Sequence, residues 1–143
     1  MPLCHLQQVY AFNGSTGGTE WTYTLGPSQQ AYGGAMGNFS GGSAPELIFG
    51  TSTGVLQALT TVGAPIWAMQ PGSNSMLQTP GVADIDGDGK TDIVAGDRAA
   101  SGNQFAVWGD NGTAKWIRAT GTDQSGGNVL VDFGDDGLLD IIF

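Results

Sequence analysis

The sequence predicts an all-β protein built from repeated units of four antiparallel strands. Three observations lead to it: the glycine content, the regular spacing of tryptophans and acidic loops, and short apolar runs bounded by glycine. The chain has 143 residues, of which 25 are glycine, a density that favours tight turns between short strands over helices. Apolar residues make up 40% and charged residues 12% of the chain, so we expect a packed core rather than disorder.

Two features recur along the chain at nearly the same interval. A glycine stands four residues before each of three tryptophans, in the pairs Gly17 and Trp21, Gly63 and Trp67, and Gly112 and Trp116. Nine-residue loops begin at Asn38, Asp84 and Asp132, which are 46 and 48 residues apart. An apolar triplet follows each loop: Leu47-Ile48-Phe49, Ile93-Val94-Ala95 and Ile141-Ile142-Phe143. Apolar runs this short are typical of buried strands.

One repeat is therefore predicted to hold four strands, with one before the loop, one after it, and a hairpin that ends near the tryptophan. A unit of about 47 residues with four antiparallel strands is typical of a β-propeller blade. We expect three blades per chain. Their ranges are strands C and D of one blade at 7–25, a blade at 33–70, a blade at 79–119, and strands A and B at 127–143.

The blade count also predicts how the chain assembles. Propellers usually have 4 to 8 blades, so three blades cannot close a ring. Two copies would give six blades, with the strands that end at Phe143 completing a sheet with the strands near Val9 and Trp21 of the partner. We therefore expect a homodimer with strand exchange between the termini. A fragment of a longer propeller and a nine-bladed trimer are the alternatives.

The loop from Asp84 to Asp92 reads D-x-D-G-D-G-x-x-D. Calcium takes 6 to 8 oxygen ligands in a compact turn. Positions 1, 3 and 5 supply the carboxylates of Asp84, Asp86 and Asp88, position 7 the carbonyl of Lys90, and position 9 the carboxylate of Asp92. Four carboxylates this close repel one another unless a cation lies among them. We predict a calcium site.

Three other interpretations of this loop fit the sequence less well. An EF-hand needs a glutamate at position 12 and flanking helices, whereas position 12 is Ala95 and both flanks are predicted strands. Magnesium seldom uses a cage made only of protein ligands. An Asp/Gly surface hairpin without metal is the third alternative.

The other two loops are weaker. In the loop from Asp132 to Asp140, Gly134 replaces the carboxylate at position 3. Its remaining ligands are Asp132, Asp136, the Leu138 carbonyl and Asp140, and fewer charged ligands weaken a calcium site. The loop from Asn38 to Glu46 lacks the carboxylates of positions 1, 3 and 5 and is expected to persist only as a turn.

The acidic loop, apolar strand and glycine resemble the FG-GAP repeat of integrin α-chain propellers and related bacterial proteins. The turn from Asn13 to Trp21 also resembles the quinoprotein-like propeller repeat. The FG-GAP resemblance implies calcium in the loop between strands A and B, held by Asp84, Asp86, Asp88, the Lys90 carbonyl and Asp92. Similar propellers include adhesion receptors, sugar-binding lectins and polysaccharide lyases, so the fold alone does not define an activity.

Charge and composition exclude several classes of function. There are 13 acidic and 4 basic residues, giving a net charge of -9, so phosphate backbones would repel the chain and no nucleic-acid partner is expected. No apolar run approaches the roughly 18 residues of a membrane span, and no signal peptide is visible in residues 1–8. A single cysteine, Cys4, excludes an intrachain disulfide. A calcium site and few lysines favour an extracellular or surface location.

No catalytic constellation is evident. His5 is the chain's one histidine, and nothing near it or Cys4 matches a nucleophile motif. We therefore predict a calcium-binding interaction or scaffold module rather than an enzyme. A carbohydrate-binding lectin is the alternative, and a calcium-dependent polysaccharide lyase is a weaker one. The repeated tryptophans are expected in the core between blades, whereas Trp108 and Tyr32 break the repeat and are candidates for a surface that binds a glycan or a protein.

Overall fold

The structure is a computed structural model that describes residues 7–70, 75–76, 78–98, 103–120 and 127–142. Cys4, His5 and Phe143 lie outside these residues. The described residues form β-strands and no helix, which confirms the all-β prediction. They therefore include no helix that could cross a membrane. The strands are β1 (Gln8–Phe12), β2 (Thr19–Thr24), β3 (Ala31–Gly37), β4 (Glu46–Thr51), β5 (Leu56–Leu59), β6 (Pro65–Met69), β7 (Gly81–Ala83), β8 (Asp92–Gly96), β9 (Asn103–Trp108), β10 (Ala114–Ala119), β11 (Val129–Val131) and β12 (Asp140–Ile142).

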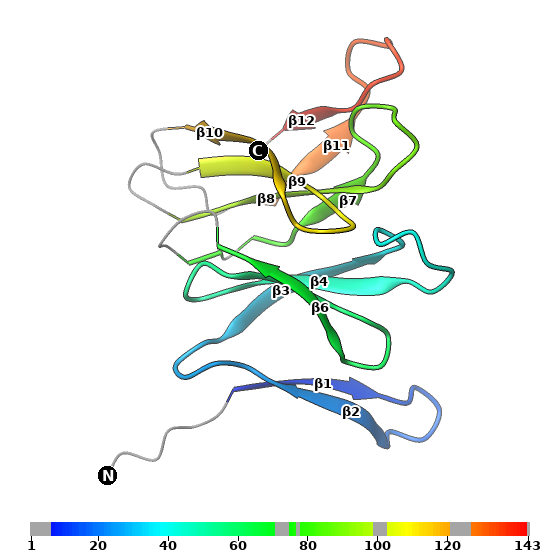
Figure 1. Cartoon of the computed structure of the whole chain (residues 1–143), viewed down its shortest axis with the longest axis vertical. Helices are drawn as coiled ribbons and strands as arrows, with labels where there is room; N and C mark the ends of the chain where they lie inside the picture. Colours follow the sequence, from blue (N-terminus) through cyan, green and yellow to red (C-terminus); the bar gives the residue numbers. More distant parts are fainter. Residues whose placement is uncertain (1–6, 71–74, 77, 99–102, 121–126, 143) are drawn as a thin grey trace.

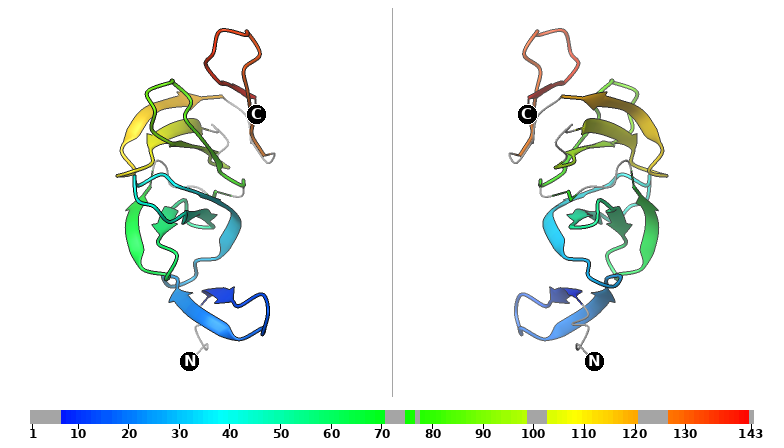
Figure 2. Two further views of the ribbon diagram at one scale, coloured as in Figure 1. Left: turned by 90° about the vertical axis from the view of Figure 1, so that its right-hand side faces the viewer. Right: turned by 90° about the vertical axis from the view of Figure 1, so that its left-hand side faces the viewer.

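The strands form two four-stranded sheets and two hairpins, all antiparallel. The sheets have the orders β3-β4-β5-β6 and β7-β8-β9-β10, and the hairpins are β1-β2 and β11-β12. Figure 1 shows the four groups stacked in chain order along the long axis. The side views show that the stack is curved (Figure 2). Strand β7 contacts both β3 and β11, so the first strands of successive groups lie next to one another.

The first four-stranded sheet begins before residue 33, which is the predicted start of that blade. Strand β3 starts at Ala31, which pairs with Thr51, and Tyr32 pairs with Gly50. A bulge at Gly33 shifts the register there. The strand therefore continues through Gly33 and Gly34, a glycine pair that in the sequence alone suggests a turn. In the next sheet β7 is shorter than expected and starts at Gly81.

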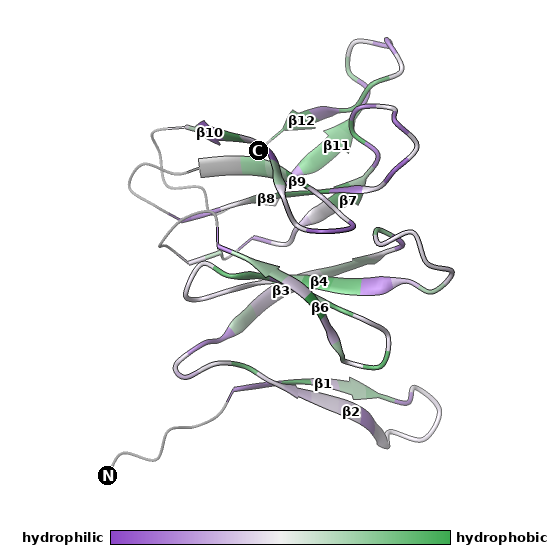
Figure 3. Ribbon diagram, in the orientation of Figure 1, coloured by the Kyte–Doolittle hydropathy of each residue, from purple (hydrophilic) through white to green (hydrophobic). Residues whose placement is uncertain are grey.

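In the two four-stranded sheets the apolar triplet lies in the second strand and packs on both faces, whereas Ile142 of the third triplet, in β12, is exposed. In β4, Ile48 packs into the core shared with the following sheet, while Leu47 and Phe49 pack toward β1 and β2. In β8, Ile93 and Ala95 face the preceding sheet, and Val94 faces β11 and β12. Figure 3 shows hydrophobic colouring on these strands and hydrophilic colouring in the loop between β7 and β8. Because side chains alternate in a strand, a continuous apolar run here serves two neighbouring sheets.

Two tryptophans join successive groups of strands in the same way. Trp21 Nε1 donates to the Thr61 carbonyl at 2.7 Å, and a Cβ on Gly63 would lie 2.6 Å from the Trp21 ring. Trp67 Nε1 donates to the Gly109 carbonyl at 2.8 Å, and a Cβ on Gly112 would lie 2.5 Å from the Trp67 ring. Each tryptophan therefore needs a glycine turn in the next sheet. The prediction that tryptophans lie between blades is confirmed for both.

Each hairpin that contains a repeated tryptophan has a β-bulge immediately before that tryptophan. The unpaired residues are Glu20, Ile66 and Lys115, because the ladder passes from the residue before each to the tryptophan after it. A bulge redirects the side chain of its extra residue. The same backbone position therefore carries an acid, an aliphatic residue and a base in the three hairpins.

Candidate metal centre

The acidic loop joins β7 to β8 and projects from the same side of the stack as the loops 38–45 and 132–139 (right side of Figure 1). Gly87 and Gly89 have φ values of 74° and 82°, a conformation that L side chains rarely adopt. These two residues turn the backbone so that its N–H groups face the loop's own carboxylates. The Asp84 carboxylate accepts hydrogen bonds from the N–H groups of Gly87 and Gly89, each at 2.8 Å.

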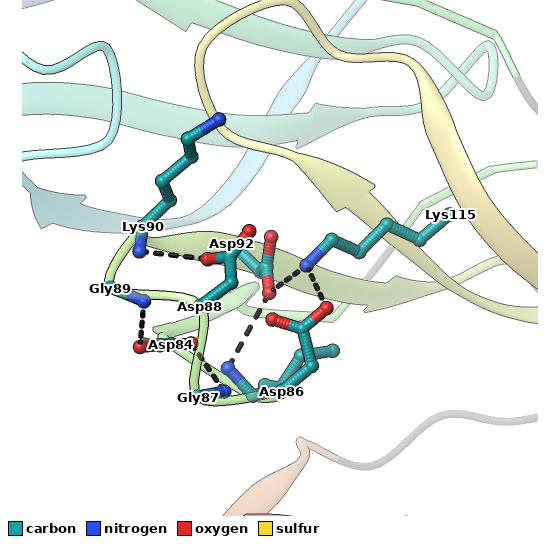
Figure 4. A network of polar contacts seen from close by, with 9 residues as sticks. Asp84, Asp86, Gly87, Asp88, Gly89, Lys90, Asp92 and Lys115 are labelled. Atoms are coloured by element: carbon teal, nitrogen blue, oxygen red, sulfur yellow. Dashed lines mark hydrogen bonds and ion pairs between the residues drawn. The ribbon is translucent and has the colours of Figure 1, made fainter.

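Three of the predicted ligands lie together. One carboxylate oxygen from each of Asp84, Asp86 and Asp88 lies within 4.8 Å of the other two, with Asp84 partly buried and the other two exposed (Figure 4). The Asp88 carboxylate also accepts the Lys90 N–H at 2.8 Å. Clustered hard oxygens of this kind are the donors that calcium prefers.

Asp92, the predicted closing ligand, begins β8, and its carboxylate is not part of this group of oxygens within 4.8 Å of one another. Its side chain is fully buried, and Asp92 Oδ2 accepts the Ile85 N–H at 3.4 Å. Asp92 Oδ1 is buried and has no hydrogen-bond partner among the described residues. Burial raises the pKa of Asp92, although hydrogen bonds from Lys115 oppose the shift. An unpaired buried carboxylate oxygen is costly, and a cation would satisfy it, so the donor set fits calcium.

Lys115, which the loop motif did not indicate, reaches the loop from the bulge in β10. Its ammonium lies 2.7 Å from Asp86 Oδ2 and 2.6 Å from Asp92 Oδ2, and its side chain is only 7% exposed. It also lies 3.6 Å from the centre of the Trp108 ring. Burial acts to lower the pKa of Lys115, but its hydrogen bonds to the two carboxylates outweigh this and raise it. The hydrogen bond from Lys115 lowers the pKa of Asp86.

The loop from Asp132 to Asp140 repeats the backbone arrangement without the same convergence of acids. Asp132 accepts the N–H groups of Asp136 and Gly137 at 3.1 and 2.8 Å, and Asp136 accepts the Leu138 N–H at 2.9 Å. Asp135 has a φ of 53° at the position of Gly87. Among the described residues, Asp132, Asp136 and Asp140 do not form a group of carboxylates within 4.8 Å of one another.

All three loops share one hydrogen bond across their base. The acid at position 9 accepts the N–H of the residue at position 2, in the pairs Glu46 and Phe39 (2.9 Å), Asp92 and Ile85 (3.4 Å), and Asp140 and Phe133 (2.9 Å). The position-9 acid therefore has a structural role in every loop.

A pocket of about 360 Å³ lies next to the metal loop. It is lined by Lys90, Trp108 and Asp110 together with parts of the loops 38–41 and 89–91. The Lys90 ammonium is 5.7 Å from the Trp108 ring centre. Tyr32 is on β3, is not among the lining residues, and donates its hydroxyl to Gln30. Of the two aromatic residues that break the repeat, only Trp108 lines this pocket.

Comparison with known proteins supports the fold. No protein-family model and no curated protein matches the chain. Among solved structures, BamB from Moraxella catarrhalis is similar, with a TM-score of 0.62 and 21% identity over 88% of this chain. The match covers 34% of BamB, so this chain spans about a third of its length. BamB is a quinoprotein-like β-propeller, and the similarity shows that this chain has β-propeller architecture.

Proposed function

We propose that the chain is a calcium-binding β-propeller module whose role is interaction rather than catalysis. The observation that carries the calcium proposal is the convergence of the Asp84, Asp86 and Asp88 carboxylates in one loop. Asp92, at position 9 of that loop, adds a buried oxygen that has no hydrogen-bond partner among the described residues. Lys90 would contribute its backbone carbonyl. The order of donors along the loop supports an FG-GAP-like site, and calcium would supply charge neutralisation there.

Calorimetric titration with calcium tests the proposal. The wild type should bind about one calcium ion tightly and gain thermal stability with calcium relative to EDTA, because a ligand bound by the folded state stabilises it. Asp88→Ala should lose most of this binding, because it removes a ligand. The variant should still fold, because Asp88 is exposed and lies outside the core. Magnesium should bind much more weakly. A wild type that shows neither heat nor a melting shift with calcium refutes the site.

We infer further that the module closes its ring with a second copy. The joints at Trp21 and Trp67 each pair a tryptophan with a glycine turn, whereas a Cβ on Gly17 would meet none of the described residues within 4 Å. Trp116 would dock on the Gly17 turn of the second copy. At position 2 of the loops, Phe39 and Ile85 are buried, yet Phe133 is 80% exposed. A neighbouring blade would cover it.

Light scattering tests the assembly. A mass near twice 14.7 kDa supports the dimer, and Trp116→Ala should weaken it. Trp67→Ala is the internal control, because that ring is used within one chain. A folded monomer at high concentration contradicts the closure.

Carbohydrate binding is the second candidate, favoured by the pocket beside Trp108. Its lining combines an aromatic ring, an exposed carboxylate at Asp110 and the polar groups of Asn38 and Ser40, the mixture that recognises polar ligands with apolar faces. A glycan array with wild type and Trp108→Ala tests this. Glycan binding by the wild type that is lost in Trp108→Ala would support the lectin function, and an array without any signal would count against it.

A further inference from the structure

Lys115 occupies a backbone position that does not require a lysine. The matching bulge residue is Ile66 in the preceding sheet and Glu20 in the first hairpin. The bulge therefore forms with an aliphatic, an acidic or a basic side chain. What differs at Lys115 is the loop that it faces, because this is the loop with three converging carboxylates.

The ammonium of Lys115 takes one oxygen from each of two proposed calcium ligands. It lies 2.7 Å from Asp86 Oδ2 and 2.6 Å from Asp92 Oδ2 (Figure 4). The second oxygen of Asp92 is buried and has no hydrogen-bond partner in the described part of the chain. The ring of Trp108, 3.6 Å away, gives the ammonium a third favourable contact that does not involve the loop.

We propose that Lys115 is a built-in cation that competes with calcium for Asp86 and Asp92 and so sets the affinity of the loop. The inference rests on the calcium site proposed above. Without calcium, Lys115 compensates the buried charge of Asp92, whose isolation would be costly. With calcium, two cations share the same carboxylates and repel each other. When calcium binds, the Lys115 ammonium moves away from those two oxygens and keeps its contact with the Trp108 ring.

Lys115 is thus an affinity-determining residue rather than a ligand. It lets the loop stay folded without metal, and it makes calcium binding weaker than the carboxylates alone would give. Removing the charge of Lys115 should therefore affect the stability of the metal-free protein and the affinity for calcium in opposite directions. The metal-free protein should lose stability, and the affinity for calcium should rise.

Calorimetry with calcium chloride on the full chain tests this, with Lys115→Met as the main variant. Lys115→Met should bind calcium at least about tenfold more tightly than the wild type, because a nearby positive charge is removed. Lys115→Arg, which keeps the charge, should stay far closer to the wild type. Arg118→Met is the matched control: Arg118 is exposed on the same strand, so the same loss of net charge should change the affinity by less than about threefold.

Thermal melting in EDTA gives a second measurement that does not depend on binding. Lys115→Met should melt below the wild type and Arg118→Met should not, and saturating calcium should remove most of the difference. Lys115→Ile provides a second variant, since Ile66 already occupies this position in another bulge.

The outcomes separate the two proposals. If the wild type binds calcium and Lys115→Met binds it equally or more weakly, the calcium site stands and competition by Lys115 is refuted. If the wild type binds calcium and both Lys115→Met and Lys115→Ile bind it at least about tenfold more tightly, the competition is supported. If no variant binds calcium, the calcium site and this inference both fail.

Discussion

The loops 84–92 and 38–46 have the same length and place in their sheets but are stabilised differently. Both join the first two strands of a four-stranded sheet and close with a position-9 acid that accepts the N–H of position 2. In the loop 38–46, Ser40 Oγ also donates to Glu46, and the Asn38 amide donates to the Gly42 carbonyl. The loop 84–92 instead gathers three carboxylates and receives Lys115 from another strand. The backbone turn is common to both loops, and the capacity for a cation depends on the side chains added to it.

The largest expected effect comes from removing the closing acid of the charged loop. Asp92→Ala should destabilise the metal-free protein by about 3–5 kcal/mol, because it leaves the buried Lys115 ammonium without that partner and breaks the hydrogen bond from Ile85. Urea unfolding in EDTA measures the loss. Asp92→Asn, which keeps an acceptor oxygen, should cost less. Equal and small losses for both would mean that the Lys115 pair contributes little.

The second prediction converts the uncharged loop into a charged one. Asn38→Asp, Ser40→Asp and Gly42→Asp together place carboxylates at positions 1, 3 and 5 of the loop 38–46. Because Ile66 provides no competing cation there, calcium should bind the new loop and stabilise the protein by about 2.7 kcal/mol at a hundredfold excess over Kd. Melting curves and calcium stoichiometry check it. An unchanged stoichiometry would show that the three carboxylates are not sufficient.

The third prediction concerns the closing acid of the uncharged loop. Glu46→Ala should cost about 1–3 kcal/mol, because it leaves the Phe39 N–H, a buried group, without its acceptor. The cost should be the same with calcium and with EDTA, unlike that of Asp92→Ala. Urea unfolding under both conditions makes the comparison. A calcium-dependent cost would mean that this loop also binds the metal.

The smallest effect is expected in the loop 132–140. Asp135 has a φ of 53° where the charged loop has Gly87 at 74°. Asp135→Gly should therefore stabilise the protein by about 0.5–1 kcal/mol through relief of backbone strain. Differential scanning calorimetry can detect the shift, with Asp135→Ala as a control that removes the same charge but keeps a Cβ at the positive φ. A loss of stability would show that the Asp135 side chain makes a contact that matters.

The repeat pattern predicted the fold well because it depends on local features. Glycine turns, apolar triplets and acidic loops at matched spacings led to all-β architecture, and the similarity to BamB shows the propeller fold. The start of β3 was less predictable, since a bulge at Gly33 carries the strand back to Ala31. Nothing in a glycine pair distinguishes a bulge from a turn until the partner strand is known.

The metal loop was partly predictable. The alternation of acids brings Asp84, Asp86 and Asp88 together because they belong to one tight turn. Asp92 lies in the strand that follows, and its burial could be expected from the apolar run after it. Lys115 could not be foreseen in the same way, since 23 residues separate it from Asp92. The available signal was that Lys115 directly precedes a repeated tryptophan in a chain with only 4 basic residues.

The sequence by itself determined which segments become strands, which turns need glycine and which loop concentrates carboxylates, because those properties depend on residues a few positions apart. Only the tertiary structure decided what these segments meet. It brought the Trp21 and Trp67 rings onto the glycine turns of the next sheets, and it directed Lys115 from a bulge into the acidic loop. These contacts depend on the register of antiparallel strands and on the stacking of sheets, and a shift of one residue would turn each side chain to the opposite face.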